Sequence, residues 1–189
     1  MENTLEILVQ TSHSAIFILS DTEVGKVQIP PNWVWTNQKG EVVNDPFGPS
    51  PTVDTQIHSM QYANSVNDLM VKFVRKDTYQ GKEMLVMERL YPIPVDSLTK
   101  AELAERVLDF EIKMKELHEN RFVHGDIRRP RWRAPECFDN IVLTKDGFRL
   151  IDTDFSIVRN RDNIEQFVYK RFDEKDELKS FSYYFLLQN

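Results

Sequence analysis

The sequence predicts an α+β protein with two lobes, a β-rich first part and a reduced helical second part. Segments rich in β-branched and aromatic residues dominate before about residue 90, and the clearest helical pattern lies after it. A third observation is that this helix leads into a loop and then a short hairpin. We therefore expect a single domain with a small lobe over residues 1–88 and a helical lobe over residues 89–189.

The first part of the chain is expected to hold five strands and one helix. They are two strands within residues 5–19, a third over 23–29, a helix over 54–64, and two strands over 69–75 and 83–89. Asp54 or Thr55 caps the helix in this interpretation. Before that helix, a proline-rich stretch predicts a long connection with a hairpin over residues 33–43.

The second part begins with the strongest helical signal. Ser97 or Thr99 is a suitable N-cap, and apolar residues then recur at steps of three and four through His118. Two short strands are expected over residues 141–143 and 148–151, joined by a turn at Gly147. The charged and then aromatic tail over residues 163–189 is expected to be helical and to pack on the helical lobe.

Composition places the chain among ordinary globular proteins and excludes several classes. Of 189 residues, 41% are hydrophobic and 29% charged, which is enough for a core. The 24 basic and 30 acidic residues give a net charge of −6, so binding of nucleic acid by bulk charge is not expected. No apolar stretch approaches the length of a membrane span.

Cysteine content and the first residues suggest a reducing compartment. The single cysteine, Cys137, has no partner for an intramolecular disulfide. The polar, acidic start has no secretory character, so an intracellular, cytoplasmic location is expected. The sequence leaves the oligomeric state open.

The chemistry-bearing residues follow the long helix. Asp126 lies in the segment His124-Gly125-Asp126, Asn140 precedes the first strand of the hairpin, and Asp152 follows the second. Phosphoryl transfer from ATP needs a carboxylate to orient the acceptor hydroxyl, together with a carboxylate and an amide oxygen to hold Mg²⁺. These three residues supply those groups from adjacent turns.

At this point the chain resembles the protein-kinase-like superfamily. His124-Gly125-Asp126 is similar to the catalytic-loop motif in the His-Gly-Asp form typical of atypical and small-molecule kinases, and Asp152-Thr153-Asp154 stands at the position of the metal-binding Asp-Phe-Gly motif. The resemblance implies a two-lobed kinase-like fold with a truncated C-terminal helical lobe. It also implies ATP and Mg²⁺ as cofactors, with Asp126 catalytic and with Asn140 and Asp152 as metal ligands.

The resemblance extends to the first lobe. Lys26 looks like the phosphate-binding lysine of the third strand, and Met87 looks like the gatekeeper residue beside the adenine pocket. The backbone from Glu88 to Leu90 would meet adenine. His124 is expected to steady the loop by hydrogen bonding rather than to act as a base.

Several features depart from the family pattern. Asn140 follows Asp126 by 14 positions instead of five, an insertion of about nine residues that is rich in arginine. The loop over residues 11–17 lacks the glycines that usually cover phosphates, and Gln56 stands where an acidic partner of Lys26 is expected. Only 37 residues follow Asp152, which predicts a minimal helical lobe.

These observations favour an ATP- and Mg²⁺-dependent phosphotransferase whose acceptor is Ser or Thr of a protein. The departures favour an alternative, a pseudokinase-like module that binds a nucleotide or a partner. Two weaker alternatives are a small-molecule kinase and a binder of acidic partners or RNA through the arginine-rich insertion over residues 128–136.

Overall fold

The computed structural model describes residues 5–10, 14–28, 51–128 and 138–188. It divides into two compact units: unit 1 contains Met1–Ile57 and Phe73–Arg89, and unit 2 contains His58–Lys72 and Leu90–Asn189. The hairpin expected over residues 33–43 lies outside the described residues. So do residues 11–13 of the expected phosphate-covering loop and residues 129–136 of the insertion.

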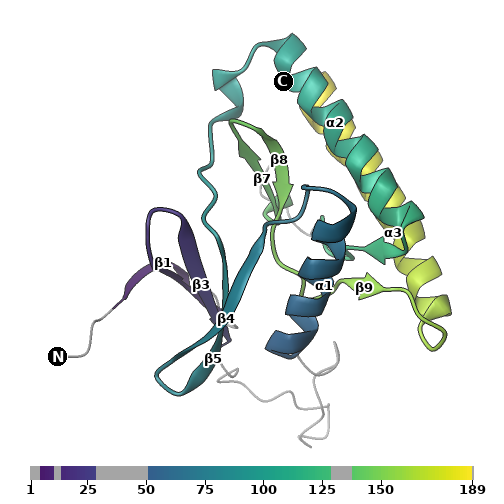
Figure 1. Cartoon of the computed structure of the whole chain (residues 1–189). Helices are drawn as coiled ribbons and strands as arrows, with labels where there is room; N and C mark the ends of the chain where they lie inside the picture. The colour runs from purple at the N-terminus through teal and green to yellow at the C-terminus, as the bar shows by residue number, and fades with distance from the viewer. Residues whose placement is uncertain (1–4, 11–13, 29–50, 129–137, 189) are drawn as a thin grey trace, which may run out of the picture. The chain divides into compact units, whose positions relative to one another are not determined.

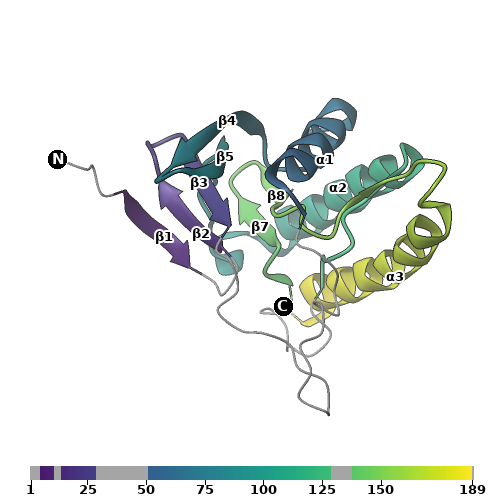
Figure 2. The ribbon, with the colours of Figure 1, turned by 90° about the horizontal axis from the view of Figure 1, so that it is seen from below.

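Unit 1 is built on a five-stranded sheet in which every neighbouring pair of strands is antiparallel (Figure 2). Its order is β1-β2-β3-β5-β4. The strands are β1 (Glu6–Gln10), β2 (Ser14–Ile18), β3 (Glu23–Gln28), β4 (Phe73–Tyr79) and β5 (Lys82–Glu88). Five strands were expected in this part of the chain, and four of them lie close to their predicted bounds.

The core of unit 1 comes from one face of this sheet. Phe17, Val27, Met84 and Val86 are buried there, and the Phe17 ring packs against Tyr79 with 4.7 Å between centroids. Burial of apolar area at roughly 25 cal/mol per Å² is the main stabilising term for such a sheet.

Unit 2 contains the longest helices, and α2 (Lys100–Glu119) and α3 (Ile164–Tyr183) lie side by side (Figure 1). The predicted cap of α2 is confirmed: the Thr99 hydroxyl accepts from the Glu102 N–H, and the Glu102 carboxylate accepts from the Thr99 N–H. The helix α1 (Val53–Val66) begins in unit 1 and ends in unit 2. A single 3-10 turn, η1 (Val95–Ser97), precedes α2.

An aromatic cluster forms much of the core of unit 2. Phe181 of α3 lies 4.7 Å from Phe110 of α2 and 5.0 Å from Phe148, measured between ring centroids. Phe185, on the short π-helical segment η3 (Tyr184–Gln188), lies 5.2 Å from Phe148. The tail is therefore helical and packs on this core, as the sequence predicted.

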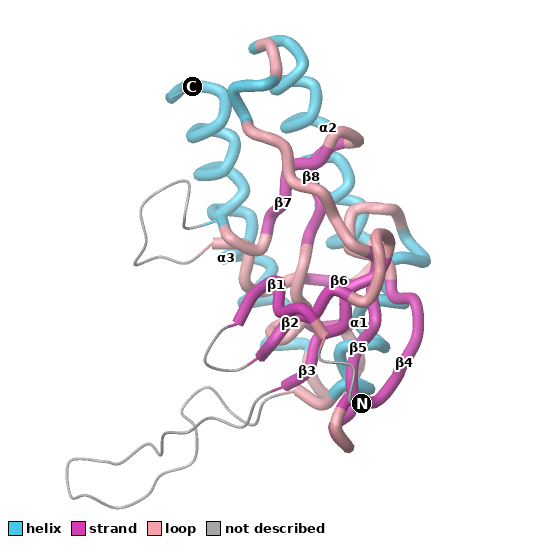
Figure 3. The backbone as a smooth tube through the Cα atoms, turned by 90° about the vertical axis from the view of Figure 1, so that its left-hand side faces the viewer, coloured by secondary structure: helices cyan, strands magenta, loops and turns pink. Residues whose placement is uncertain are grey.

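The described part of unit 2 also contains two small antiparallel pairs of strands. The hairpin of β7 (Ile141–Thr144) and β8 (Gly147–Leu150) was predicted, and β8 lies beside α2 (Figure 3). The second pair joins β6 (Phe122–Val123) to β9 (Ile157–Val158). Strands of two residues carry no readable period, so the sequence did not indicate them.

The strand expected over residues 69–75 begins later, because its first residues pair with β8 and not with β5. Leu69, Met70 and Val71 are fully buried, and Leu69 and Val71 exchange backbone hydrogen bonds with Leu150 at 2.8 Å each. Regular pairing with β5 starts at Phe73. The continuous apolar run therefore predicted burial correctly but placed the residues in the wrong sheet.

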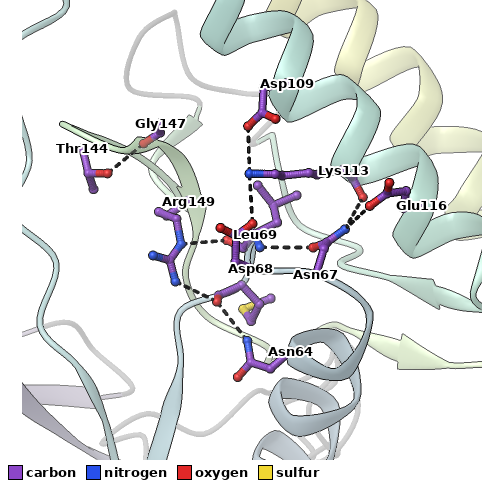
Figure 4. A network of polar contacts seen from close by, with 11 residues as sticks. Asn64, Asn67, Asp68, Leu69, Asp109, Lys113, Glu116, Thr144, Gly147 and Arg149 are labelled. Atoms are coloured by element: carbon purple, nitrogen blue, oxygen red, sulfur yellow. Dashed lines mark hydrogen bonds and ion pairs between the residues drawn. The ribbon is translucent and has the colours of Figure 1, made fainter.

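A polar network secures this segment within unit 2 (Figure 4). Lys113 of α2 bridges Asp68 and Asp109 at 2.9 Å each, and its ammonium lowers the pKa of Asp68. Arg149 of β8 donates to the carbonyls of Leu69 and Met70. The segment after α1 is thus tied to α2 on one side and to β8 on the other.

Among the described residues, no helix is both long enough and apolar enough to cross a membrane.

Candidate functional site

The predicted catalytic loop leaves β6 in the interior of unit 2. Phe122 and Val123 are fully buried, and β9 pairs with them in register. Asp126 follows three residues after the strand and lies on a partly buried stretch of loop. The short strand thus gives the loop a fixed starting point.

Asn140 is brought directly to Asp126. Its amide nitrogen donates to the Asp126 carbonyl at 2.8 Å and to the Asp126 carboxylate at 3.0 Å. Both groups of Asp126 are acceptors, so the side-chain nitrogen of Asn140 must face Asp126, and its side-chain oxygen (Oδ1) points elsewhere. The 14-residue separation therefore does not prevent these two side chains from meeting.

Asp152 lies at the end of the β7–β8 hairpin, whose other end carries Asn140. Ile141 pairs with Leu150, and the Ile151 N–H donates to the Asn140 carbonyl at 3.0 Å. Asp152 itself has φ +67°, a left-handed conformation that a non-glycine residue rarely adopts. Its side chain accepts from the Asp154 N–H at 3.0 Å, which helps to hold this turn. Backbone strain of this kind clusters at functional sites.

His124 connects the loop to the turn that carries Asp152. The ring is 1% exposed, and Nε2 donates to the Ile151 carbonyl at 3.0 Å. Within the described residues, Nδ1 is buried without a hydrogen-bond partner. A buried ring with one bond to backbone fits the structural role that the sequence suggested.

Glu174 of α3 is a site residue that the sequence analysis missed. Its buried carboxylate accepts from the backbone N–H groups of His124 (3.0 Å) and Gly125 (2.9 Å), and from the His118 ring at 2.6 Å. A signal was present, because Glu174 lies seven residues from both Phe167 and Phe181 on the buried face of α3. A carboxylate in an apolar stripe indicates a specific partner.

Lys170 is a second missed residue. It lies one turn before Glu174 and donates to the Phe155 carbonyl at 2.8 Å, with Nζ 5.2 Å from the centre of the Phe155 ring. Gly125 leaves room for it, since a Cβ there would lie 2.8 Å from Nζ and 2.6 Å from the Phe155 oxygen. Gly125 also has φ +76°, so glycine is required twice over.

Charges on this face of α3 perturb one another. Burial raises the pKa of Glu177 to about 7, helped by the negative charges of Glu174, Asp126 and Asp173 and opposed by Arg128. The charge of Asp126 thus contributes to the raised pKa of Glu177 although the two residues lie on different elements.

The side chains of this region could bind a divalent cation only if other ligands, such as phosphate oxygens and water, completed its coordination. No group of three His, Cys, Asp or Glu side chains in the described part of the chain is placed to hold a metal ion. Mg²⁺ is commonly held by one or two protein oxygens, with phosphate oxygens and water completing the shell. The side-chain amide oxygen of Asn140 (Oδ1) and the Asp152 carboxylate are suited to a site with so few protein ligands.

Three of the predicted site residues, Lys26, Met87 and Glu88, belong to unit 1. Lys26 is only 5% exposed on β3, between Ile16 and Leu85 of the neighbouring strands, so it is not an ordinary surface lysine. Met87 is buried on β5, and Glu88, which ends that strand, is partly buried. Their nucleotide-binding roles stay predictions.

Two further residues bear on these predictions. Leu90, which belongs to unit 2, is partly buried, and its expected contact with adenine stays a prediction. Gln56, in unit 1, is 1% exposed and donates to the Pro51 carbonyl at 3.4 Å.

Comparison with known proteins supports the fold. No family model matches the sequence, and no curated protein matches it. The structure is similar to that of the Cydia pomonella granulovirus kinase PK-1, with a TM-score of 0.51 and 14% sequence identity. The match covers 81% of this chain and 54% of that kinase, so the chain spans about half of its length. The chain has a protein-kinase-like fold with a small helical portion.

Proposed function

We propose that the chain is a phosphotransferase that moves the γ-phosphoryl group of ATP to a hydroxyl group. The observation that carries this proposal is the convergence of Asp126, Asn140 and Asp152 within unit 2. The Asn140 amide bonds to Asp126, and the hairpin that Asn140 opens ends at Asp152. The similarity in fold to a kinase is in keeping with it.

In the proposed reaction, the Asp126 carboxylate orients the acceptor hydroxyl and takes its proton. The bond from the γ-phosphorus to the β,γ-bridging oxygen breaks, a bond from phosphorus to the acceptor oxygen forms, and ADP leaves. Mg²⁺, when bound, neutralises charge on the phosphates. Asn140 and Asp152 would hold the ion. The hydrogen bonds from the Asn140 amide keep the Asp126 carboxylate in one orientation.

The acceptor and the location of the protein are part of the proposal. A protein hydroxyl is the preferred acceptor, because a protein substrate requires little binding surface from a small helical lobe. A cytoplasmic location agrees with the single cysteine. Lys26, Met87, Glu88 and Leu90 are assigned to phosphate and adenine by resemblance alone.

A binding module without phosphoryl transfer is the second candidate. The observation that favours it is Gln56, a buried neutral amide at the position where the resemblance calls for an acidic residue. Such a protein would still bind nucleotide, so binding and transfer must be measured separately.

Binding is tested by thermal unfolding with Mg²⁺ and ATP added together and singly. A ligand at a hundred times its dissociation constant stabilises the folded state by about 2.7 kcal/mol. We expect the wild type to gain stability from the pair and Asp152→Asn to lose most of that gain.

Asp146→Asn is the matched control, because Asp146 is exposed at the turn of the same hairpin. It should behave as the wild type does. A wild type that ignores nucleotide, or an Asp152→Asn variant with the full gain, would contradict the proposed site.

A further inference from the structure

Lys170 is a cation placed beside the predicted catalytic loop. Its Nζ lies against Gly125, the neighbour of Asp126, at the position that a side chain on Gly125 would otherwise occupy. The ammonium group has three hydrogens, and its hydrogen bond within the described residues is the one to the Phe155 carbonyl. The other two hydrogens have no acceptor among the described residues.

The surroundings of Lys170 make those unused hydrogens significant. Burial lowers the pKa of Lys170, while the negative charges of Asp126, Glu174 and Glu177 act in the opposite direction. In the described part of the chain, none of these carboxylates forms a direct ion pair with it, whereas Glu174 is occupied by His118 and two backbone groups. A partly desolvated cation without a direct counter-ion favours binding of an anion.

The described part of the loop also contains a cation, Arg128, two residues after Asp126. Arg128 is directed to α3, where its guanidinium approaches the Ser180 hydroxyl at 3.4 Å. A phosphoryl group that approaches the Asp126 carboxylate carries negative charge, so a positive group nearby is needed to offset the repulsion. Lys170, whose Nζ lies against Gly125 of this loop, is a positive group that can meet this need.

We propose that Lys170 binds the phosphoryl group that is transferred at Asp126, and that Gly125 is required because it makes room for this lysine. The proposal rests on the proposed function and adds a residue from α3 to it. The side chain contacts the γ-phosphoryl group through the donor hydrogens that Phe155 leaves unused. Lys170 would therefore distinguish ATP from ADP.

The test is a comparison of ATP and ADP affinities, each with Mg²⁺, for the wild type and Lys170→Gln. Glutamine keeps N–H donors on a flexible side chain but carries no charge. We expect the affinity for ATP to fall about tenfold, the factor that corresponds to about 1.4 kcal/mol. The affinity for ADP should stay within about twofold, because the lost contact is to the γ-phosphate.

Lys175→Gln is the control, since Lys175 is an exposed lysine on the same helix. It should leave both affinities unchanged. If Lys170→Gln keeps the wild-type ratio of the two affinities, Lys170 serves only to hold Phe155 and the inference is overturned. A wild type that binds neither nucleotide would instead overturn the proposed function itself.

Discussion

At the scale of single residues, Gly125 combines two constraints that are usually found apart. Its φ of +76° is unfavourable for any residue with a Cβ, and the space that a Cβ would fill holds the Phe155 carbonyl and the Lys170 ammonium. Gly81, in the turn between β4 and β5, has nearly the same φ of +75° but no atom within 4 Å of a Cβ position. The two glycines therefore separate backbone strain from crowding.

Substitution by alanine at each position should show that separation. Gly81→Ala is expected to cost about 1 kcal/mol of stability through strain alone. Gly125→Ala should cost a further 1–3 kcal/mol, roughly, because crowding is added. Urea unfolding of both variants measures the difference, and equal losses would show that the loop relaxes freely around the new methyl group.

At the scale of elements, α3 supports the predicted catalytic loop. Its buried face presents Glu174 to two backbone N–H groups of the loop, and Glu177 lies one turn further along. The two carboxylates differ in what compensates their burial. Glu174 accepts several hydrogen bonds, whereas burial raises the pKa of Glu177 to about 7, helped by the negative charges of its acidic neighbours.

Opposite effects are expected when each glutamate is replaced by glutamine. The unfolded-state pKa of Glu177 is near 4.5, so the raised folded-state value costs nothing below that pH. The cost grows as pH rises and is complete above about 7. Glu177→Gln should therefore raise the melting temperature at pH 8 and change it little at pH 5.

Glu174→Gln should instead lower stability by about 1–3 kcal/mol, since the amide presents hydrogens to groups that are already donors. Melting curves of the two variants at pH 5 and pH 8 provide the comparison. A gain for Glu177→Gln that is equal at both pH values would exclude ionisation of Glu177 as its cause.

The elements also show where sequence reasoning succeeded. The helix α2 was predicted nearly to the residue because its cap and its apolar period agree. The hairpin carrying Asn140 and Asp152 was predicted from its turn and its β-branched residues. In contrast, Leu69 to Val71 read as the start of a strand, and only tertiary pairing with Leu150 explains their burial.

The site residues divide in the same way, into those that local sequence indicates and those that only tertiary structure brings together. The motif residues in the loop and hairpin could be named because they are close in the chain or match a known pattern. Lys170 and Glu174 come from a helix about 45 residues after Asp126, and no local pattern states which loop a charged side chain will meet. The buried position of Glu174 between Phe167 and Phe181 was the available signal.

At the scale of the whole molecule, the chain joins a five-stranded unit to a helical unit in a protein-kinase-like fold. It spans 54% of the viral kinase that it resembles. The proposed chemistry depends on few residues, because phosphoryl transfer relies mainly on positioning and electrostatics. The proposed proton acceptor and Mg²⁺ ligands all lie within unit 2. Asp126 is the one whose loss should affect transfer without abolishing nucleotide binding.

The most direct test is transfer of labelled γ-phosphate from ATP with Mg²⁺, to a protein acceptor or to the chain itself, by the wild type and Asp126→Asn. Asp146→Asn serves as the control. The account predicts transfer by the wild type and the control, and a rate reduced by about 10²–10⁴ in Asp126→Asn, the usual contribution of a positioned proton acceptor. An Asp126→Asn variant that transfers at the wild-type rate, or a wild type that binds Mg²⁺ and ATP but transfers to no acceptor, would contradict it.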